Sequence, residues 1–231
     1  MTQITWLGHG TVQFRFSSDK VLLLDPWTDG NPSFPKNYEI KQVDAIAVSH
    51  GHFDHIHDVI PLAKKFEPKI VSIAETGWWL ESKGVKNTIG MNKGGTVDLG
   101  FVKLTMTHAI HSCGIKDGDQ IIYGGEAAGY VLTLEDGRRI YFAGDTNVFS
   151  DMGLIQELYE PELAFLPIGD HFTMSPYEAA KAARLLKAKK IVPMHFGTFP
   201  VLTGTPQQLA ERLKGEPTQV WPLEIGTAVD W

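Results

Sequence analysis

Three histidines and one aspartate fall within the six residues from His50 to His55, in the order His-Gly-His-Phe-Asp-His. Neutral imidazole is the commonest protein ligand for zinc-like metals, and a carboxylate can complete or bridge such a site. The apolar residues 45–48 directly upstream predict a short buried strand, so the cluster follows a core element. A solvated histidine-rich loop is the alternative interpretation. The internal position beside a predicted strand favours metal binding.

Backbone geometry divides these four side chains into two pairs. Side chains of an extended segment alternate between its two sides, so His50 and His52 point to the same side and can reach one metal. Asp54 and His55 are adjacent in the chain and share that side only if the chain turns. We therefore expect Asp54 and His55 to serve a second metal beside the first.

Further candidate ligands follow other short apolar segments. Asp145 and His195 each come within two residues of a predicted strand, and His111 follows another by a few residues. Loops at the carboxyl ends of strands converge on one edge in α/β folds, so we expect these residues to gather with His50. His108 lies three residues before His111 and competes with it for the same role.

The pattern His50-x-His52-x-Asp54-His55 resembles the HxHxDH signature of the metallo-β-lactamase superfamily. Within it, the chain looks like the small metal-dependent hydrolases of the UPF0173-like group, which is related to the ascorbate-6-phosphate lactonases. The resemblance implies an α/β fold, a four-layer αββα sandwich of the metallo-β-lactamase type, with residues 1–231 as a single domain. The order of predicted strands and helices also indicates two packed sheets with helices outside.

The resemblance further implies two divalent metal ions, with zinc as the first choice and manganese or iron as alternatives. The implied ligands are histidines and aspartates in three groups: His50, His52 and His111 for one metal; Asp54, His55 and His195 for the other; and Asp145 as the bridge between them. The third motif of the family favours His111 over His108.

The implied chemistry is metal-assisted hydrolysis. Asp145 stands where one large β-lactamase class has cysteine, and His52 stands where the oxygen-reducing di-iron members have glutamate, so hydrolysis is favoured over redox chemistry. Asp54 is by resemblance the residue that orients the attacking water while it binds metal. A small lactone or other ester is the first choice of substrate, a phosphodiester or RNA the second, and a β-lactam the third. A non-catalytic metal-dependent sensor or binding protein is the alternative of another class.

Other residues are candidates for lining the substrate site. His9 lies in a turn with glycines on both sides, where it either lines the site or fixes the turn. Asp170 and His171 follow the predicted buried strand 163–168 and resemble pocket-lining positions of the group. His171, His9 or a metal-bound water are the candidates for the acid that protonates the leaving group. Asp25 ends another predicted strand and either orients a ligand histidine or caps the next loop.

Composition excludes several classes of protein. The chain of 231 residues has a net charge of −6, which argues against a general binder of nucleic acid or anionic membrane. The single cysteine, Cys113, excludes an intramolecular disulfide and fits a reducing cytoplasm. The sequence has no secretory signal pattern and no apolar run of about 18 residues, so we expect a cytoplasmic protein. A homo-oligomer is a further prediction, because aromatics in the loop 26–38 would suit a subunit contact.

Periodicity and turn residues predict the remaining elements. Strands are expected at 4–7, 12–16, 21–24, 70–73, 97–107 with a break at Gly100, 129–134, 139–143, 163–168, 191–194 and near Val220. Helices are expected at 58–66, 75–83, 175–187 and 206–213. The polar, glycine-rich segment between His111 and Gly129 is expected to be a loop.

Overall fold

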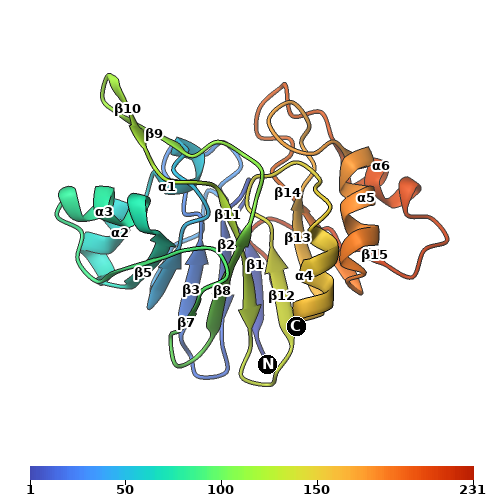
Figure 1. Ribbon diagram of the computed structural model, residues 1–231, viewed down its shortest axis with the longest axis horizontal. Helices are drawn as coiled ribbons and strands as arrows, with labels where there is room; N and C mark the ends of the chain where they lie inside the picture. Colours follow the sequence, from blue (N-terminus) through green and yellow to red (C-terminus); the bar gives the residue numbers. More distant parts are fainter. The chain divides into compact units, whose positions relative to one another are not determined.

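The computed structural model describes all residues 1–231, and the chain divides into two compact units (Figure 1). Unit 1 comprises Met1–Asn92, Ser112–Ala127 and Glu224–Trp231. Unit 2 comprises Lys93–His111 and Ala128–Leu223. Each unit therefore combines segments that are distant in the sequence, and the expectation of one domain over residues 1–231 stays a prediction.

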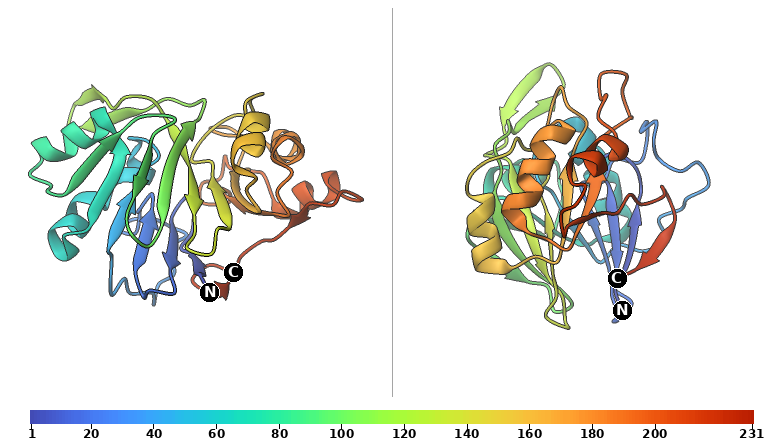
Figure 2. Two further views of the ribbon diagram at one scale, coloured as in Figure 1. Left: turned by 60° about the horizontal axis from the view of Figure 1, so that its bottom comes forward. Right: turned by 90° about the vertical axis from the view of Figure 1, so that its right-hand side faces the viewer.

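Unit 1 contains a seven-stranded mixed sheet. In spatial order its strands are β16 (Ala228–Asp230), β1 (Gln3–Trp6), β2 (Val12–Arg15), β3 (Val21–Leu24), β4 (Ala45–Ala47), β5 (Lys69–Ile73) and β6 (Thr88–Met91). The strands from β3 to β6 are parallel, and the others pair antiparallel. Because β1 pairs with β16, the two chain ends lie side by side in both views of Figure 2.

The core of unit 1 explains why its strands read as continuous apolar runs. All four residues of β3 are buried, as expected for strands covered on both faces. The helices of this unit are α1 (Phe53–Ile56), α2 (Val59–Phe66) and α3 (Ala74–Ser82). Residues Val59 and Leu62 of α2 belong to the same apolar cluster as Ile46 of β4. This packing of α2 on β4 fixes the strand that leads directly into the histidine-rich segment.

Most aromatic side chains of the loop 26–38 cover the core. Trp27 is buried, and Phe34 and Tyr38 are half-buried against the apolar cluster of unit 1. Asp58 holds the start of the loop, because its carboxylate accepts hydrogen bonds from the backbone N–H groups of residues 28 and 29. These aromatics therefore give no support to the predicted homo-oligomer, which stays a prediction.

The segment between His111 and Gly129 is not a plain loop, and this expectation was wrong. It contains the antiparallel hairpin of β9 (Gly114–Asp117) and β10 (Gln120–Tyr123), which projects from unit 1 in Figure 1. The turn uses Gly118 with a positive φ of 61°. The strands of this hairpin are short and contain isoleucine, but the glycines and charged residues around them made the segment look like a loop in the sequence.

Unit 2 contains a second seven-stranded mixed sheet. In spatial order its strands are β15 (Gln219–Val220), β14 (Lys190–Met194), β13 (Leu163–Pro167), β12 (Arg139–Phe142), β11 (Ala128–Thr133), β8 (Lys103–His108) and β7 (Thr96–Asp98). The strands from β12 to β15 are parallel. The loops that follow β12, β13 and β14 therefore leave the same edge of the sheet.

The helices of unit 2 are α4 (Met152–Tyr159), α5 (Pro176–Leu186) and α6 (Pro206–Arg212). The helix predicted at 175–187 begins with a capping box: the Ser175 hydroxyl accepts from the Glu178 backbone N–H, and the Glu178 carboxylate accepts from the Ser175 backbone N–H. Alanines 179, 180, 182 and 183 of α5 are buried against the sheet. None of the helices has both the length and the apolar character needed to cross a bilayer.

Candidate metal centre

The ligand segment of unit 1 leaves β4 and turns into α1. His50 is 1% exposed, and its Nε2 lies 3.0 Å from Nδ1 of His52. The helical turn of α1 then brings Asp54 and His55 back toward them: the ring centroids of His50 and His55 are 4.2 Å apart, and His55 Nε2 lies 3.7 Å from Asp54 Oδ2. Unit 1 therefore brings together all four residues of the predicted cluster.

Asp25 supports this cluster through hydrogen bonds. Its buried carboxylate accepts hydrogen bonds from the Ser49 backbone N–H at 2.7 Å and from the Ser49 hydroxyl. The same carboxylate lies 2.8 Å from Nδ1 of His55. Donation of the Nδ1 proton to Asp25 leaves the Nε2 lone pair of His55 to bind a cation. Of the two interpretations of Asp25, the structure gives the contact with a ligand histidine.

Ser49 extends this arrangement to His50. Its Oγ lies 2.9 Å from Nδ1 of His50. Because the hydroxyl proton of Ser49 goes to Asp25, its oxygen accepts the Nδ1 proton of His50. The Nε2 lone pair of His50 is then also directed toward the cluster.

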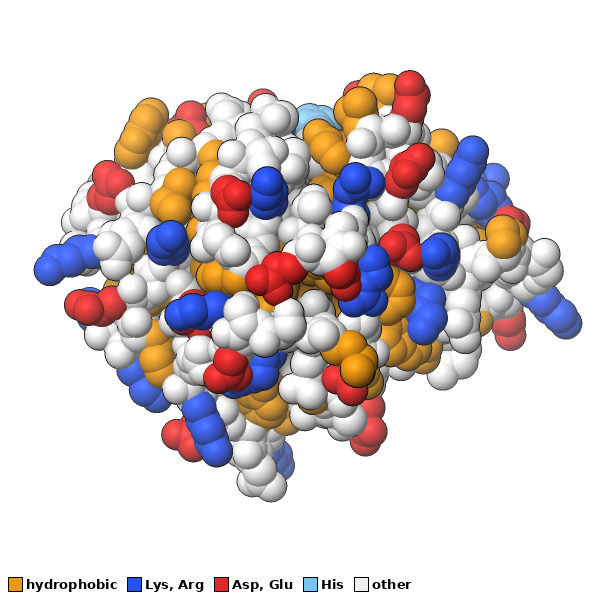
Figure 3. All heavy atoms as spheres, turned by 90° about the horizontal axis from the view of Figure 1, so that it is seen from below, with side chains coloured by type: hydrophobic (Ala, Val, Ile, Leu, Met, Phe, Trp, Pro, Cys, Tyr) orange, Lys and Arg blue, Asp and Glu red, His pale blue; other side chains and the backbone are white.

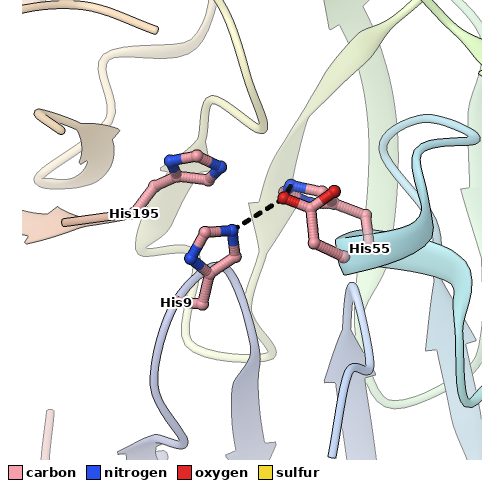
Figure 4. Close-up of side chains that lie close together, drawn as sticks. His9, His55 and His195 are labelled. Atoms are coloured by element: carbon pink, nitrogen blue, oxygen red, sulfur yellow. Dashed lines mark hydrogen bonds and ion pairs between the residues drawn. The ribbon is translucent and has the colours of Figure 1, made fainter. Parts of the chain in front are cut away.

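His9 contacts the carboxylate of this group. Its Nε2 lies 2.8 Å from Oδ2 of Asp54, the contact drawn as the dashed line from His9 in Figure 4. The His9 side chain is fully buried. The backbone of His9 has a positive φ of 53°, and its carbonyl accepts from the Trp6 indole. At the neighbouring Gly10, a Cβ would lie 2.8 Å from Cε1 of His55. The glycine-flanked turn thus packs closely on the ligands, and His9 is placed to orient Asp54.

The donor set of unit 1 fits a divalent cation. The imidazoles of His50 and His55 lie beside the buried Asp25, and one side-chain N or O atom of each of the three residues lies within 4.8 Å of the others. Asp25 uses its carboxylate to hold His55, so the candidate ligand atoms of this group are the Nε2 atoms of the two histidines. Buried histidines and carboxylates that converge in this way are typical ligands of zinc, manganese or iron. The fixed tautomers of His50 and His55 direct their Nε2 atoms away from the supporting groups, as a metal ligand requires.

Unit 2 contains the other three predicted ligands, which are one aspartate and two histidines close to its carboxylate. Asp145 and His195 are 2% and 1% exposed, and they follow β12 and β14. His195 Nε2 lies 3.1 Å from Asp145 Oδ2, and His111 Nε2 lies 3.7 Å from the same oxygen. The imidazole nitrogens of His111 and His195 therefore both approach the same carboxylate oxygen of Asp145.

His108 has a different environment from His111. It is exposed, its Nδ1 lies 3.1 Å from the Lys93 ammonium, and its ring meets the edge of Phe149. The structure thus places His111, rather than His108, beside Asp145. The two histidines are three residues apart, and the strand β8 ends at His108.

Asp170 and His171 lie in a strained loop after β13. Both are exposed and have positive φ values of 66° and 56°. The Asp170 side chain accepts from the His171 backbone at 2.8 Å. At the preceding Gly169, a Cβ would lie only 2.1 Å from the backbone oxygen of His195. The loop therefore packs on the backbone of a candidate ligand, while the predicted roles of Asp170 and His171 toward a substrate stay predictions.

Two further supporting residues were missed by sequence analysis. Cys113 Sγ accepts a hydrogen bond from the backbone N–H of Gly51 at 3.2 Å, and Ser112 Oγ lies 3.1 Å from His52 Nε2. Both residues are at least 60 positions from their partners. Only the fold reveals them.

Residues 20–196 match the family model of the beta-lactamase superfamily domain. The chain belongs to this superfamily. It is 66% identical over 229 residues to a UPF0173 metal-dependent hydrolase of Solibacter usitatus, covering 99% of this chain and 100% of that protein. It is 56% identical over 208 residues to one from Koribacter versatilis, covering 90% and 89%.

A solved structure of a superfamily relative has the same fold. The metallo hydrolase Igni18 from the archaeon Ignicoccus hospitalis matches with a TM-score of 0.84 and 31% identity, over 99% of this chain and 97% of that one. The predicted α/β fold of the metallo-β-lactamase type is thus confirmed. This superfamily member is a metal-dependent hydrolase.

Proposed function

We propose that the protein is a binuclear metal-dependent hydrolase that cleaves an ester or lactone bond in a small substrate. The observation that carries the proposal is the pair of buried donor sets described above. In unit 1, Asp25 and Ser49 leave the Nε2 atoms of the histidines as ligands. In unit 2, Asp145 lies between His111 and His195.

The proposed ligands are assigned to the two ions as the superfamily resemblance implies. One ion would be held by His50, His52 and His111, and the other by Asp54, His55 and His195. Asp145 would be shared. Divalent ions bound by these groups supply Lewis acidity and make water nucleophilic near neutral pH. Zinc is the first choice, and manganese or iron would accept the same donors.

The side chains around the ions orient the reaction. Asp54 orients the attacking water, and the 2.8 Å contact with His9 Nε2 fixes the carboxylate that does so. His171 is exposed in the loop that packs on the His195 backbone, and we assign it the proton donation to the departing alkoxide. Each assignment uses a group that has no evident role in the apolar cores.

Surface charge favours a small substrate over a nucleic acid. On the face drawn in Figure 3, Lys and Arg side chains are interspersed with Asp and Glu rather than gathered into a basic field. The net charge of −6 points the same way, because binding a phosphate backbone requires clustered cations. An ester or lactone needs no such surface.

The test combines metal analysis with a substrate screen. Protein purified without chelator is expected to contain about two metal ions per chain and to hydrolyse lactones in preference to phosphodiesters and a chromogenic β-lactam. Turnover of phosphodiesters alone would replace the ester proposal with a phosphodiesterase. Failure to take up metal after reconstitution would contradict the metal assignment.

A matched pair of variants tests the ligands. His111→Ala is expected to lose at least about 100-fold in kcat/KM and to bind less metal. His108→Ala, three residues away and exposed, is expected to keep both. Equal behaviour of the two variants would overturn the assignment of His111.

A further inference from the structure

His52 is the proposed ligand whose ring has a side chain beside each of its two nitrogens. Its Nδ1 lies 3.0 Å from Nε2 of His50, and its Nε2 lies 3.1 Å from Oγ of Ser112. The two histidine rings are nearly perpendicular, with an angle of 76° and centroids 4.6 Å apart. Ser112 therefore contacts the nitrogen of His52 that does not contact His50.

The contact between the two histidines has two interpretations, which depend on the tautomer of His52. The Ser49 hydroxyl accepts the Nδ1 proton of His50, which leaves the lone pair of His50 Nε2 facing Nδ1 of His52. If Nδ1 of His52 carries the proton, it donates to His50 and cannot bind metal. If it carries a lone pair, the two lone pairs repel each other at 3.0 Å unless both bind a cation.

The Ser112 hydroxyl favours the tautomer of His52 that binds metal. A neutral imidazole has a single proton, so a proton on Nε2 that is donated to Ser112 Oγ leaves Nδ1 with its lone pair. The same hydroxyl can rotate and donate to Nε2 when the proton is on Nδ1. Metal binding at His52 therefore requires no movement of the backbone at Ser112.

The backbone that carries Ser112 is fixed by the next residue. The Cys113 thiol accepts from the Gly51 N–H and donates to the Gly124 carbonyl, both at 3.2 Å. That carbonyl also accepts from the Thr76 hydroxyl at 2.7 Å, and Thr76 belongs to α3. All four of these residues are buried. A buried chain of hydrogen bonds thus connects α3 to the ligand segment through the residue that follows Ser112.

Close packing also holds this segment in place. A Cβ at Gly51 would lie 2.4 Å from Cγ1 of Ile115, and one at Gly124 would lie 2.3 Å from the carbonyl oxygen of Cys113. Neither glycine has room for a side chain, so the segments meet backbone to backbone. The position of Ser112 relative to His52 is therefore set by buried contacts, although Ser112 itself is exposed.

The exposure of Ser112 limits the size of its contribution. If the hydroxyl is removed, a water molecule can accept the Nε2 proton of His52, at a cost of up to about 2 kcal/mol for ordering that water. Removing a group that orients a metal-binding histidine typically weakens metal affinity about 10–100-fold. Because water can replace the hydroxyl, the effect expected for Ser112 is at the lower end of that range.

We propose that Ser112 is a positioning residue for His52, which accepts the Nε2 proton of the imidazole and thereby directs Nδ1 to the metal. Ser112 acts through the ligand and requires no contact with substrate. The proposal rests on the assignment of His50 and His52 to one ion in the function proposed above.

Zinc affinity tests this role without requiring turnover, by competition of the full chain with a chromophoric chelator. Ser112→Ala is expected to bind zinc about tenfold more weakly, because the acceptor is lost. Ser112→Thr keeps a hydroxyl and should bind zinc like wild type. Ser82→Ala is the matched control: it removes another serine hydroxyl of unit 1, which donates to the Trp79 carbonyl, and should leave zinc affinity unchanged.

The proton on the His52 ring gives a second readout, which a merely structural role of Ser112 would not change. In isotope-labelled, zinc-loaded protein, NMR identifies the His52 nitrogens as the signals that are missing in His52→Gln. Nε2 is expected to carry the proton in wild type. That proton should exchange with water faster in Ser112→Ala, because its acceptor is then a mobile water molecule.

The role of Ser112 would be overturned by wild-type zinc affinity in Ser112→Ala, by equal weakening in Ser112→Ala and Ser112→Thr, or by a proton on Nδ1 of His52 in the zinc-loaded protein. Weaker binding by His52→Gln together with wild-type binding by Ser112→Ala would remove Ser112 and keep His52 as a ligand. Weaker binding by Ser112→Ala in a protein that hydrolyses no lactone would support Ser112 and contradict the ester proposal.

Discussion

Asp25 illustrates how a single buried carboxylate supports a metal-binding segment. Its carboxylate accepts hydrogen bonds from the Ser49 backbone N–H, the Ser49 hydroxyl and the His55 ring. The backbone of Asp25 itself is strained, with a φ of 45°. His9 and His195 also have positive φ. Strain of this kind persists where the surrounding structure requires it, commonly at functional sites.

Asp25→Asn is expected to weaken metal affinity about 10–100-fold with little loss of fold, because an amide cannot accept from three donors and favours the wrong His55 tautomer. Competition with a chromophoric chelator measures this. Asp44→Asn serves as the control, because this carboxylate belongs to the same unit but contacts Lys20, Val21 and Gln42 rather than the ligand segment. An unchanged affinity of the Asp25 variant would remove Asp25 from the metal centre.

Gly51 is the residue where the ligand segment and the hairpin meet. Gly51→Ala places a Cβ 2.4 Å from Ile115, so we expect a loss of about 1–3 kcal/mol in the free energy of unfolding, together with weaker metal binding. Urea titration and chelator competition measure the two effects. Gly153→Ala in α4 meets no atom within 4 Å and should be neutral or stabilising.

At the scale of elements, the connection between β3 and β4 is held by Asp44. Its carboxylate accepts from Lys20 Nζ at 2.9 Å, from the Val21 N–H at 2.9 Å and from the Gln42 amide at 2.7 Å. Burial by itself raises the pKa of Asp44, but these donors outweigh it and hold the pKa below its ordinary value. The neighbouring strand β4 leads directly to the ligand segment.

The lowered pKa of Asp44 predicts an acid-sensitive contribution to stability. A carboxyl with a lower pKa in the folded state stabilises the fold above its unfolded pKa of about 4, and this contribution is lost as pH falls through the folded pKa. Asp44→Asn should therefore cost about 1 kcal/mol at pH 7 and less at pH 3. Urea unfolding at both pH values checks this; a constant difference would contradict it.

At the scale of the whole molecule, proposed ligands come from both units of the chain. Metal removal should lower the Tm by about 5–10 °C, because ions in excess over their Kd stabilise the folded state by a few kcal/mol. Scanning calorimetry before and after treatment with chelator measures the shift. It should be smaller for His111→Ala than for wild type and unchanged for His108→Ala, whereas equal shifts would argue against a ligand role for His111.

Much of the secondary structure could be predicted because it depends on local pattern. The buried runs of β3, β13 and β14 and the cap of α5 are legible in a few neighbouring residues. The β9–β10 hairpin was missed, because its strands are short and its stability comes from contacts with Gly51 and α3.

The sequence by itself determined the types and spacing of the proposed metal ligands and their positions at the ends of strands. These follow from imidazole and carboxylate chemistry and from local periodicity, which need no knowledge of distant contacts. Only the tertiary structure decided which groups orient them. Asp25 meets His55 across 30 residues and His9 meets Asp54 across 45, and such pairings arise from packing between elements rather than from local pattern.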